Sequence, residues 1–189
     1  VHSENHRAKT ARKMVMELLV ADQPSRDTAH DPDSELWRYA ETQDVDAARF
    51  PAKASPAPDS SHPAIAVNMD ACIQCNLCVR ACREVQVNDV IGLAGRGADA
   101  HIVFDFGDDM GASTCVGCGE CVQACPTGAL MPKTLLDDSQ ALAITPDRKV
   151  DSVCPYCGVG CQLTFSVKDD KIVSVSGRQG PANAGRLCV

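Results

Sequence analysis

Aromatic residues are scarce in this chain: its 189 residues include one Trp, two Tyr and four Phe, or 4% of the total. We therefore expect several small modules rather than one large hydrophobic core. The formal net charge is −7, and no basic tract is long enough to indicate nucleic-acid binding. No apolar run approaches the length that crosses a membrane. The sequence thus predicts neither a nucleic-acid partner nor a membrane partner.

Cysteine, in contrast, is abundant, with twelve residues in three groups. The first two groups read C-x2-C-x2-C-x3-C, and the third reads C-x2-C-x3-C with one further cysteine far downstream. Thiolates at these spacings are typical ligands of iron-sulfur clusters, so we expect all twelve to bind metal and to carry three [4Fe-4S] clusters that move single electrons. In chain order the groups are Cys72, Cys75, Cys78 and Cys82; Cys115, Cys118, Cys121 and Cys125; and Cys154, Cys157, Cys161 and Cys188.

Two other uses of cysteine compete with this interpretation. Structural zinc also uses pairs of C-x2-C, but it needs only four ligands and does not usually take a third cysteine at x2 and a fourth at x3. Disulfides suit an even cysteine count, yet cysteines two or three residues apart in a tight loop are poorly placed to pair. A zinc-stabilised interaction module stays the alternative from a different class, and colour separates the two, because iron-sulfur proteins are brown and zinc sites are colourless.

The first two groups form an internal repeat, since they share every cysteine, the Val after the third and the Ala before the fourth. They resemble bacterial two-cluster ferredoxins, in which three cysteines hold one cube and the fourth, at the start of a short helix, reaches the other cube. Folding and cluster loading are then coupled, because neither motif can close a site alone. The resemblance implies one cluster on Cys72, Cys75, Cys78 and Cys125, and a second on Cys115, Cys118, Cys121 and Cys82.

The third group reads C-P-Y-C-G-V-G-C, followed by residues 162–177, which alternate apolar and polar residues around a Lys-Asp-Asp turn. This pattern predicts a hairpin that would bring Cys188 back beside the loop of three cysteines. The arrangement resembles the Fe4S4 subdomain that opens the catalytic region of molybdopterin oxidoreductases such as formate dehydrogenases and nitrate reductases. Taken alone, this site could also be a four-cysteine zinc ribbon.

The run from Cys78 to Gln86 sharpens the resemblance. It is similar to the C-V-R-x-C-x-E-V-Q run in NAD-linked formate dehydrogenase alpha subunits, iron-only hydrogenases and the large iron-sulfur subunit of NADH:quinone oxidoreductase, and Arg83 stands where a simple ferredoxin usually has proline. Combined with C-P-Y-C-G-V-G-C, it resembles the alpha subunit of a molybdenum- or tungsten-dependent formate dehydrogenase over nearly the whole chain.

This resemblance implies that formate is oxidised to CO2 at a molybdenum or tungsten bis-molybdopterin guanine dinucleotide centre in a missing C-terminal region of the same subunit. Electrons would then pass through the three clusters toward a flavin- and NAD-binding subunit. The residues present assemble no catalytic centre of their own. Within the same chemistry, the alternatives are the iron-sulfur region of a nitrate reductase, a hydrogenase or an NADH:quinone oxidoreductase.

The N-terminal region departs from the resembling family at one point. The family has a segment D-H-P-L-D-C-x2-C that holds a further cluster, but here Gln23 replaces its histidine, and Asp27 and His30 stand where cysteines would be. We expect that cluster to be absent and these residues to lie on the surface. His62 and His101 have no partner that the sequence can predict.

We therefore predict an α+β chain of small iron-sulfur modules. The expected parts are a helical N-terminal segment (1–49, with a second helix capped by Asp33 or Ser34), a Pro/Ala-rich linker (50–63), a two-[4Fe-4S] ferredoxin-like domain (64–133, with a strand over 101–106), a connector (134–148), and a truncated [4Fe-4S] subdomain (149–189). Both ends read as cut. Many thiolates indicate a reducing compartment, hence the cytoplasm. The glycines expected to let backbone N–H groups approach sulfur, or simply to form tight turns, are Gly117, Gly119, Gly158 and Gly160.

Overall fold

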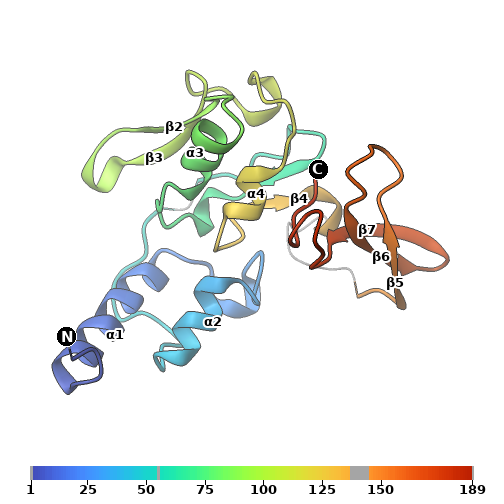
Figure 1. Cartoon of the computed structure of the whole chain (residues 1–189). Coiled ribbons are helices and arrows are strands. Elements are labelled where there is room, and N and C mark those ends of the chain that lie inside the picture. Colours follow the sequence, from blue (N-terminus) through green and yellow to red (C-terminus); the bar gives the residue numbers. More distant parts are fainter. Residues whose placement is uncertain (1, 55, 137–144, 189) are drawn as a thin grey trace.

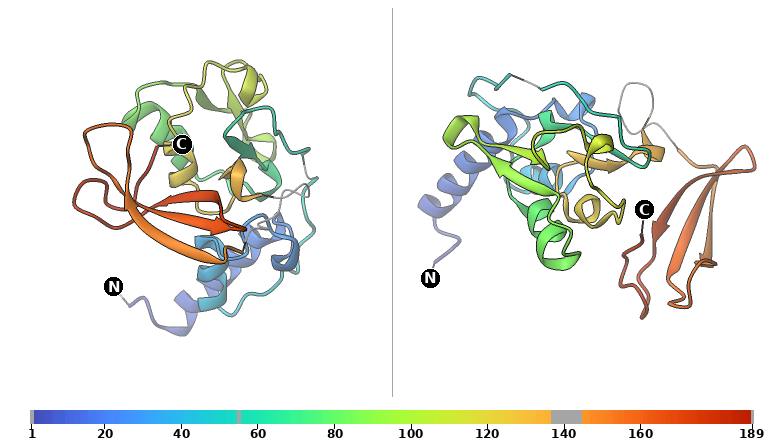
Figure 2. Two further views of the ribbon diagram at one scale, coloured as in Figure 1. Left: turned by 90° about the vertical axis from the view of Figure 1, so that its right-hand side faces the viewer. Right: turned by 90° about the horizontal axis from the view of Figure 1, so that it is seen from above.

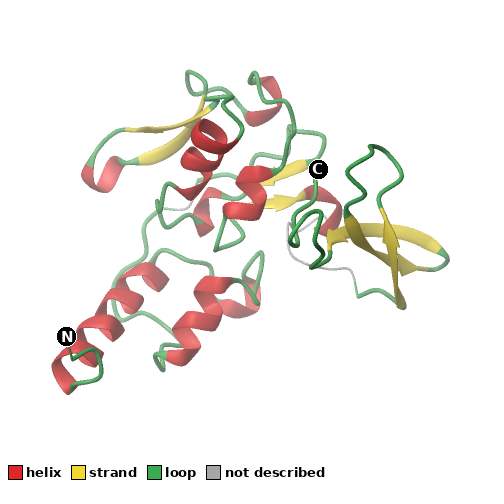
Figure 3. Ribbon diagram, in the orientation of Figure 1, coloured by secondary structure: helices red, strands yellow, loops and turns green. Residues whose placement is uncertain are grey.

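The computed structural model describes residues 2–54, 56–136 and 145–188. Part of the predicted connector, residues 137–144, lies outside the described residues. The chain is α+β, with a pair of N-terminal helices, a central part with two pairs of short strands, and a three-stranded sheet (Figure 1). Figure 3 shows that the longer helices lie near the N-terminus, whereas the C-terminal part consists of strands and loops. Among the described helices, none is both long and apolar enough to cross a bilayer.

The bounds of the elements are as follows. The α-helices are α1 (His6–Ala21), α2 (Glu35–Thr42), α3 (Leu77–Arg80) and α4 (Glu120–Ala124). The strands are β1 (Ile65–Val67), β2 (Ile91–Ala94), β3 (His101–Phe104), β4 (Leu130–Pro132), β5 (Arg148–Val153), β6 (Gln162–Lys168) and β7 (Lys171–Gly177). A π-helical turn, η3 (Ala81–Val85), continues α3, and short 3-10 helices are η1 (Arg26–Thr28), η2 (Met69–Ala71), η4 (Gly97–Asp99), η5 (Met110–Ala112) and η6 (Lys133–Leu135).

The two N-terminal helices pack on a small core of their own. The side chain of Asn5 caps α1 by accepting the N–H of Ala8, and Ser34, one of the two predicted caps, accepts the N–H of Trp37 at the start of α2. Each cap satisfies a backbone donor that the first helical turn leaves open. The core between the helices contains Met16, Val20, Ala29, Leu36, Trp37, Ala40 and Val45.

The central part is closed by the pairing of its first and last strands. Strands β1 and β4 are antiparallel, with Ile65 opposite Pro132 and Val67 opposite Leu130. Because β1 precedes the first cysteine motif and β4 follows the second, this pairing brings the two motifs into one unit. The core of this unit includes three cysteines as well as apolar side chains: Ile65, Val67, Cys78, Val79, Cys82, Val90, Ile91, Ile102, Phe104, Met110, Cys121 and Leu130. The predicted strand at 101–106 is confirmed as β3, which pairs with β2 and ends at Phe104.

The C-terminal sheet has the order β5-β6-β7, and both pairs are antiparallel. The predicted hairpin is confirmed, with β6 and β7 joined by Asp169 and Asp170, whose φ values are 50° and 58°. Asp tolerates this left-handed conformation better than most residues. The sequence did not predict β5, whose residues are nearly all exposed and carry little hydrophobic pattern.

Specific contacts join the three parts, which Figure 2 shows from two further sides. The N–H of Leu36 in α2 donates to the carbonyl of Pro126 at 3.0 Å. His30 is buried, contrary to the expected surface position, because its Nε2 lies 2.9 and 3.0 Å from the two carboxylate oxygens of Asp70. The pair fixes the loop between the N-terminal helices to the residues just before the first cysteine motif.

Candidate iron-sulfur centres

The two cysteine loops of the repeat adopt the same local backbone. The N–H of Gln74 donates to Cys72 Sγ at 3.4 Å, and the N–H of Gly117 donates to Cys115 Sγ at the same distance. Gln74 and Gly117 occupy equivalent positions, and both have left-handed φ values, 56° and 65°. N–H donors held beside a sulfur atom stabilise the negative charge of a thiolate or of a cluster sulfur.

The next turn of each loop repeats the correspondence, with φ values of 61° at Asn76 and 77° at Gly119. Of the four glycines that the sequence singled out, Gly117 thus places its N–H on a sulfur. Gly119 and Gly160 also have positive φ, which fits the tight-turn alternative. Gly158 is not among the glycines with positive φ.

The ferredoxin resemblance implied that the fourth cysteine of each motif starts a short helix, but the structure places the third cysteine there. The third cysteine of each motif, Cys78 or Cys121, lies within the first two residues of α3 or α4 and is buried. The fourth does not start a helix: Cys82 lies in the π-turn that follows α3, and Cys125 is the C-cap of α4. The first motif thus continues into an extra turn, where Arg83 replaces the proline that would otherwise interrupt the helix.

One group of four sulfurs combines three cysteines of the first motif with one of the second. Burial, together with the negative charges of Cys72, Cys125 and Cys75, raises the pKa of Cys78 to about 12. All four cysteines line a single small cavity with Met69 and other side chains. Thiols that are buried and that repel one another when ionised favour a bound cation, because the cation compensates their charge.

A second group has the reciprocal composition. Burial raises the pKa of Cys121 to about 12, and the neighbouring Cys115, Cys118, Cys78 and Cys82 act in the same direction. Cys82, from the first motif, also raises the pKa of Cys115, although burial is the largest cause there. The charge of Cys78, from the first group, also acts on Cys121, and this interaction links the two groups. The structure therefore brings together the residues of both predicted ligand sets.

The third predicted set is more open. Cys154 and Cys161 flank the loop between β5 and β6, and the N–H of Cys154 donates to the carbonyl of Cys161 at 2.8 Å. The side chain of Asn183 binds both the N–H and the carbonyl of Gln162, which holds the returning C-terminal segment beside this loop. Cys157 and Cys188 are exposed. The closure of this set by Cys188 stays a prediction.

The C-terminal segment also contacts the central part. Gln123 in α4 donates to the carbonyl of Leu187 at 2.8 Å and accepts the N–H of the same residue at 3.0 Å. Arg186 forms an ion pair with Glu120 in the same helix. These contacts place Cys188 next to the helix that carries Cys121. The sequence offered no signal for them, because they join residues far apart in the chain.

Iron-sulfur clusters fit the chemistry of the first two sets. The four thiols of the first set line one small cavity, and the backbone N–H groups of Gln74 and Gly117 already donate to Cys72 Sγ and Cys115 Sγ. Within the described residues, no three His, Cys, Asp or Glu side chains close around a single metal ion. Each iron of a cube takes one thiolate, so cluster ligands surround a volume and do not meet at one ion.

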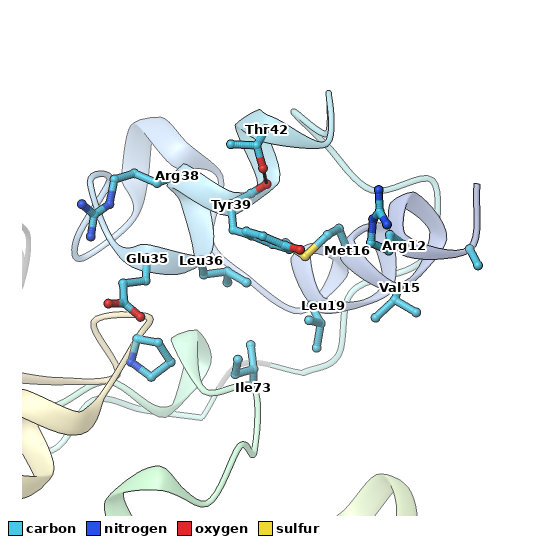
Figure 4. A pocket seen from close by; sticks show the side chains of 12 residues that line it. Arg12, Val15, Met16, Leu19, Glu35, Leu36, Arg38, Tyr39, Thr42 and Ile73 are labelled. Atoms are coloured by element: carbon cyan, nitrogen blue, oxygen red, sulfur yellow. Dashed lines mark hydrogen bonds between the residues drawn. The ribbon is translucent and has the colours of Figure 1, made fainter. Parts of the chain in front are cut away.

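None of the twelve cysteines, all of which lie in described residues, forms a disulfide. An open cavity lies elsewhere, between α1 and α2, and Figure 4 shows the side chains of both helices around it. Its lining is mainly apolar, with Leu36 and Tyr39 on one side and Val15 and Leu19 on the other. It reaches Ile73 in the first cysteine loop.

Comparisons with known proteins agree with this division. Residues 71–129 match the family model "4Fe-4S dicluster domain", and residues 147–189 match "Molybdopterin oxidoreductase Fe4S4 domain". The chain thus combines a 4Fe-4S dicluster domain with a molybdopterin oxidoreductase Fe4S4 domain. Clusters of the 4Fe-4S type bound by cysteine motifs, and electron transfer through them in a complex like the molybdopterin oxidoreductases, follow from this combination.

Individual relatives are distant and much longer. A subunit of an NADH-quinone oxidoreductase from Rhizobium meliloti (strain 1021) is 34% identical over 67% of this chain and 14% of the relative. A putative formate dehydrogenase from Staphylococcus haemolyticus (strain JCSC1435) is 24% identical over 100% of this chain and 23% of the relative. The chain therefore spans less than a quarter of these curated relatives. A chain in the crystal structure of an NAD+-reducing [NiFe]-hydrogenase shares the fold, with a TM-score of 0.60 and 24% identity over 69% of this chain and 57% of that one.

Proposed function

We propose that this chain conducts electrons through three [4Fe-4S] clusters in the alpha subunit of a molybdenum- or tungsten-dependent, NAD-linked formate dehydrogenase. The formate dehydrogenase relative supports the assignment, because its similarity extends over the whole chain and includes both cluster-binding domains. Formate would be oxidised to CO2 at a bis-molybdopterin guanine dinucleotide centre in the remainder of the subunit. A flavin- and NAD-binding subunit would receive the electrons.

The observation that carries the proposal is the exchange of one cysteine between the two motifs. Cys125 lies among the cysteines of the first motif, and Cys82 lies among those of the second. We assign Cys72, Cys75, Cys78 and Cys125 to the first cluster, Cys115, Cys118, Cys121 and Cys82 to the second, and Cys154, Cys157, Cys161 and Cys188 to the third. When bound, a cluster accepts and releases one electron at a time.

Contacts between the C-terminal segment and α4 hold the third cysteine set close to the dicluster domain. The C-terminal segment is held to α4 by Gln123 and by the ion pair of Arg186 with Glu120. The last ligand of the third set therefore adjoins the helix that supplies ligands to both other sets. This contact supports a route that begins at the molybdopterin side, passes the third cluster and continues through the dicluster domain.

The proposed domain division keeps the bounds expected from the sequence. Residues 1–49 form the helical segment, 50–63 the linker, 64–133 the ferredoxin-like domain, 134–148 the connector, and 149–189 the start of the molybdopterin oxidoreductase region. Because reduced thiolates are needed to assemble the clusters, we place the protein in the cytoplasm.

Two measurements test the proposal. Anaerobic iron and acid-labile sulfide analysis of this chain should give about twelve iron atoms per chain, and about eight would leave the third site empty. Zinc in a colourless protein would instead support an interaction module and refute electron transfer. In the full-length protein, formate should reduce the clusters, as observed by EPR. Clusters that dithionite reduces and formate does not would refute the formate assignment alone.

A second candidate is the iron-sulfur region of another NAD-linked complex. The higher identity to the relative from an NADH-quinone oxidoreductase, 34% over 67% of this chain, favours this candidate. The fold shared with a chain of an NAD+-reducing [NiFe]-hydrogenase also fits this candidate. A nitrate reductase is the further alternative that the sequence left open. Reduction of the clusters in the full-length protein by NADH or H2, with no response to formate, would support this candidate.

A further inference from the structure

His62 is a buried histidine whose ring is held in one orientation. Its exposed fraction is 6%, and its Nδ1 accepts the backbone N–H groups of Ala64 and Ile65 at 3.2 and 3.1 Å. Burial lowers the pKa of His62, although the nearby carboxylate of Asp59 acts in the opposite direction, so the ring is neutral at pH 7. A neutral imidazole that accepts at Nδ1 carries its proton on Nε2.

The Nε2 edge of this ring faces the loop of the second cysteine set. A Cβ atom built on Gly117 would lie 3.8 Å from Cε1 and 4.0 Å from Nε2 of His62. Gly117 stands between Cys115 and Cys118, and its own N–H already donates to Cys115 Sγ. Because glycine has no side chain, the ring edge lies directly against the backbone of the cluster-binding loop.

The segment that carries His62 is fixed from two sides. The Nζ atom of Lys133 donates to the carbonyls of Ser60 and His62, at 2.6 and 3.3 Å. The carboxylate of Asp59 accepts the N–H of Met110 at 2.7 Å, and its backbone pairs with Val67. The position of the imidazole is therefore determined before any cluster binds, which is the condition for an effective hydrogen-bond donor.

We propose that His62 is a positioning residue whose Nε2–H points toward the cluster of Cys115, Cys118, Cys121 and Cys82 and raises its reduction potential. The inference rests on the proposed function, since it requires a cluster on these four cysteines. Reduction adds an electron to the cluster, and a hydrogen-bond donor beside the sulfurs stabilises the more negative, reduced form.

The test compares His62→Leu, which removes the donor, with His62→Gln, which keeps one N–H group. His101→Gln is the matched control, because His101 is exposed and lies outside the three sets. EPR-monitored redox titration of each iron-loaded chain should show a lower midpoint potential for one cluster in His62→Leu, a smaller shift in His62→Gln, and no shift in the control. Pulsed EPR of the reduced chain labelled with 15N-histidine should show a nitrogen coupling that either His62 variant abolishes and His101→Gln preserves.

Each outcome has a defined meaning. Unchanged potentials in His62→Leu at full iron content would overturn the role of His62 and leave the proposed clusters standing. If both His62 variants lose iron, pulsed EPR of the labelled unaltered chain and of the labelled His101→Gln control tests the inference instead. The absence of any histidine nitrogen coupling in these two chains would overturn it. A chain with no iron-sulfur signals at all would refute the proposed function itself.

Discussion

Substitution of Cys125 by alanine should damage the cluster of the other motif. Cys125 caps the end of α4, yet its charge acts on Cys72 and Cys78 in the first loop. The structure places four sulfurs in each of the first two sets, so Cys125→Ala leaves three ligands in the first set and four in the second. Starting from about twelve iron atoms, the variant should keep about eleven if a three-iron cluster survives, or about eight if the cluster is lost.

Double variants make the result decisive, because residues of one unit are not additive. Cys72→Ala with Cys125→Ala damages one cluster twice and should retain about eight iron atoms. Cys115→Ala with Cys125→Ala damages both and should retain about four. Iron and sulfide analysis of anaerobically purified chains measures this directly. The opposite ranking of the two double variants would refute the exchange of cysteines and indicate that each motif binds its own cluster.

Three further predictions concern protons, packing and the contact between domains. Burial raises the pKa of Cys78 and Cys121 to about 12, so iron must displace their protons when it binds. Reconstitution with iron and sulfide, followed by visible absorbance, should therefore be more complete at about pH 8.5 than at about pH 6.5. Equal yields at the two pH values would contradict this. Ile65→Ala should destabilise the iron-loaded chain by about 2–5 kcal/mol in denaturant unfolding, because Ile65 is fully buried, whereas Ile172→Ala at an exposed site should cost about 0.5 kcal/mol or less. Gln123→Ala removes two hydrogen bonds to the C-terminal segment. It should accelerate hydrogen exchange over residues 183–187 while the iron content stays unchanged. Unchanged exchange would show that the contact does not hold the segment.

The elements that the sequence predicted are those with strong local signals. The helical N-terminal segment, the Ser34 cap and the Lys-Asp-Asp turn of the C-terminal hairpin are all encoded within a few residues, and the structure confirms them. The ferredoxin resemblance likewise implied which cysteines belong to each of the first two sets, and that clusters bind there stays a prediction. Strand β5 was missed because its exposed residues form no alternating apolar pattern, and only pairing with β6 makes it a strand.

The residues that the sequence could not place depend on distant partners. The sequence predicted a surface position for His30, but Asp70 gives it a buried partner. His62 was assigned to an extended linker, but the pairing of Asp59 with Val67 draws the end of that linker onto the central part. Such roles arise from tertiary contacts, and short sequence patterns carry no signal for them.

The proposed exchange of cysteines between the motifs also bears on the order in which the clusters would form during synthesis. The ribosome makes the chain from the N-terminus, so Cys82 is already present when the second loop, ending at Cys121, emerges. The first loop, although made earlier, lacks its fourth thiolate until Cys125 follows at the end of α4. The cluster whose loop appears later can therefore be completed first. Until then, the three thiols of the first loop remain open to oxidation, which makes delivery of iron and sulfide soon after the second motif emerges an advantage for this chain.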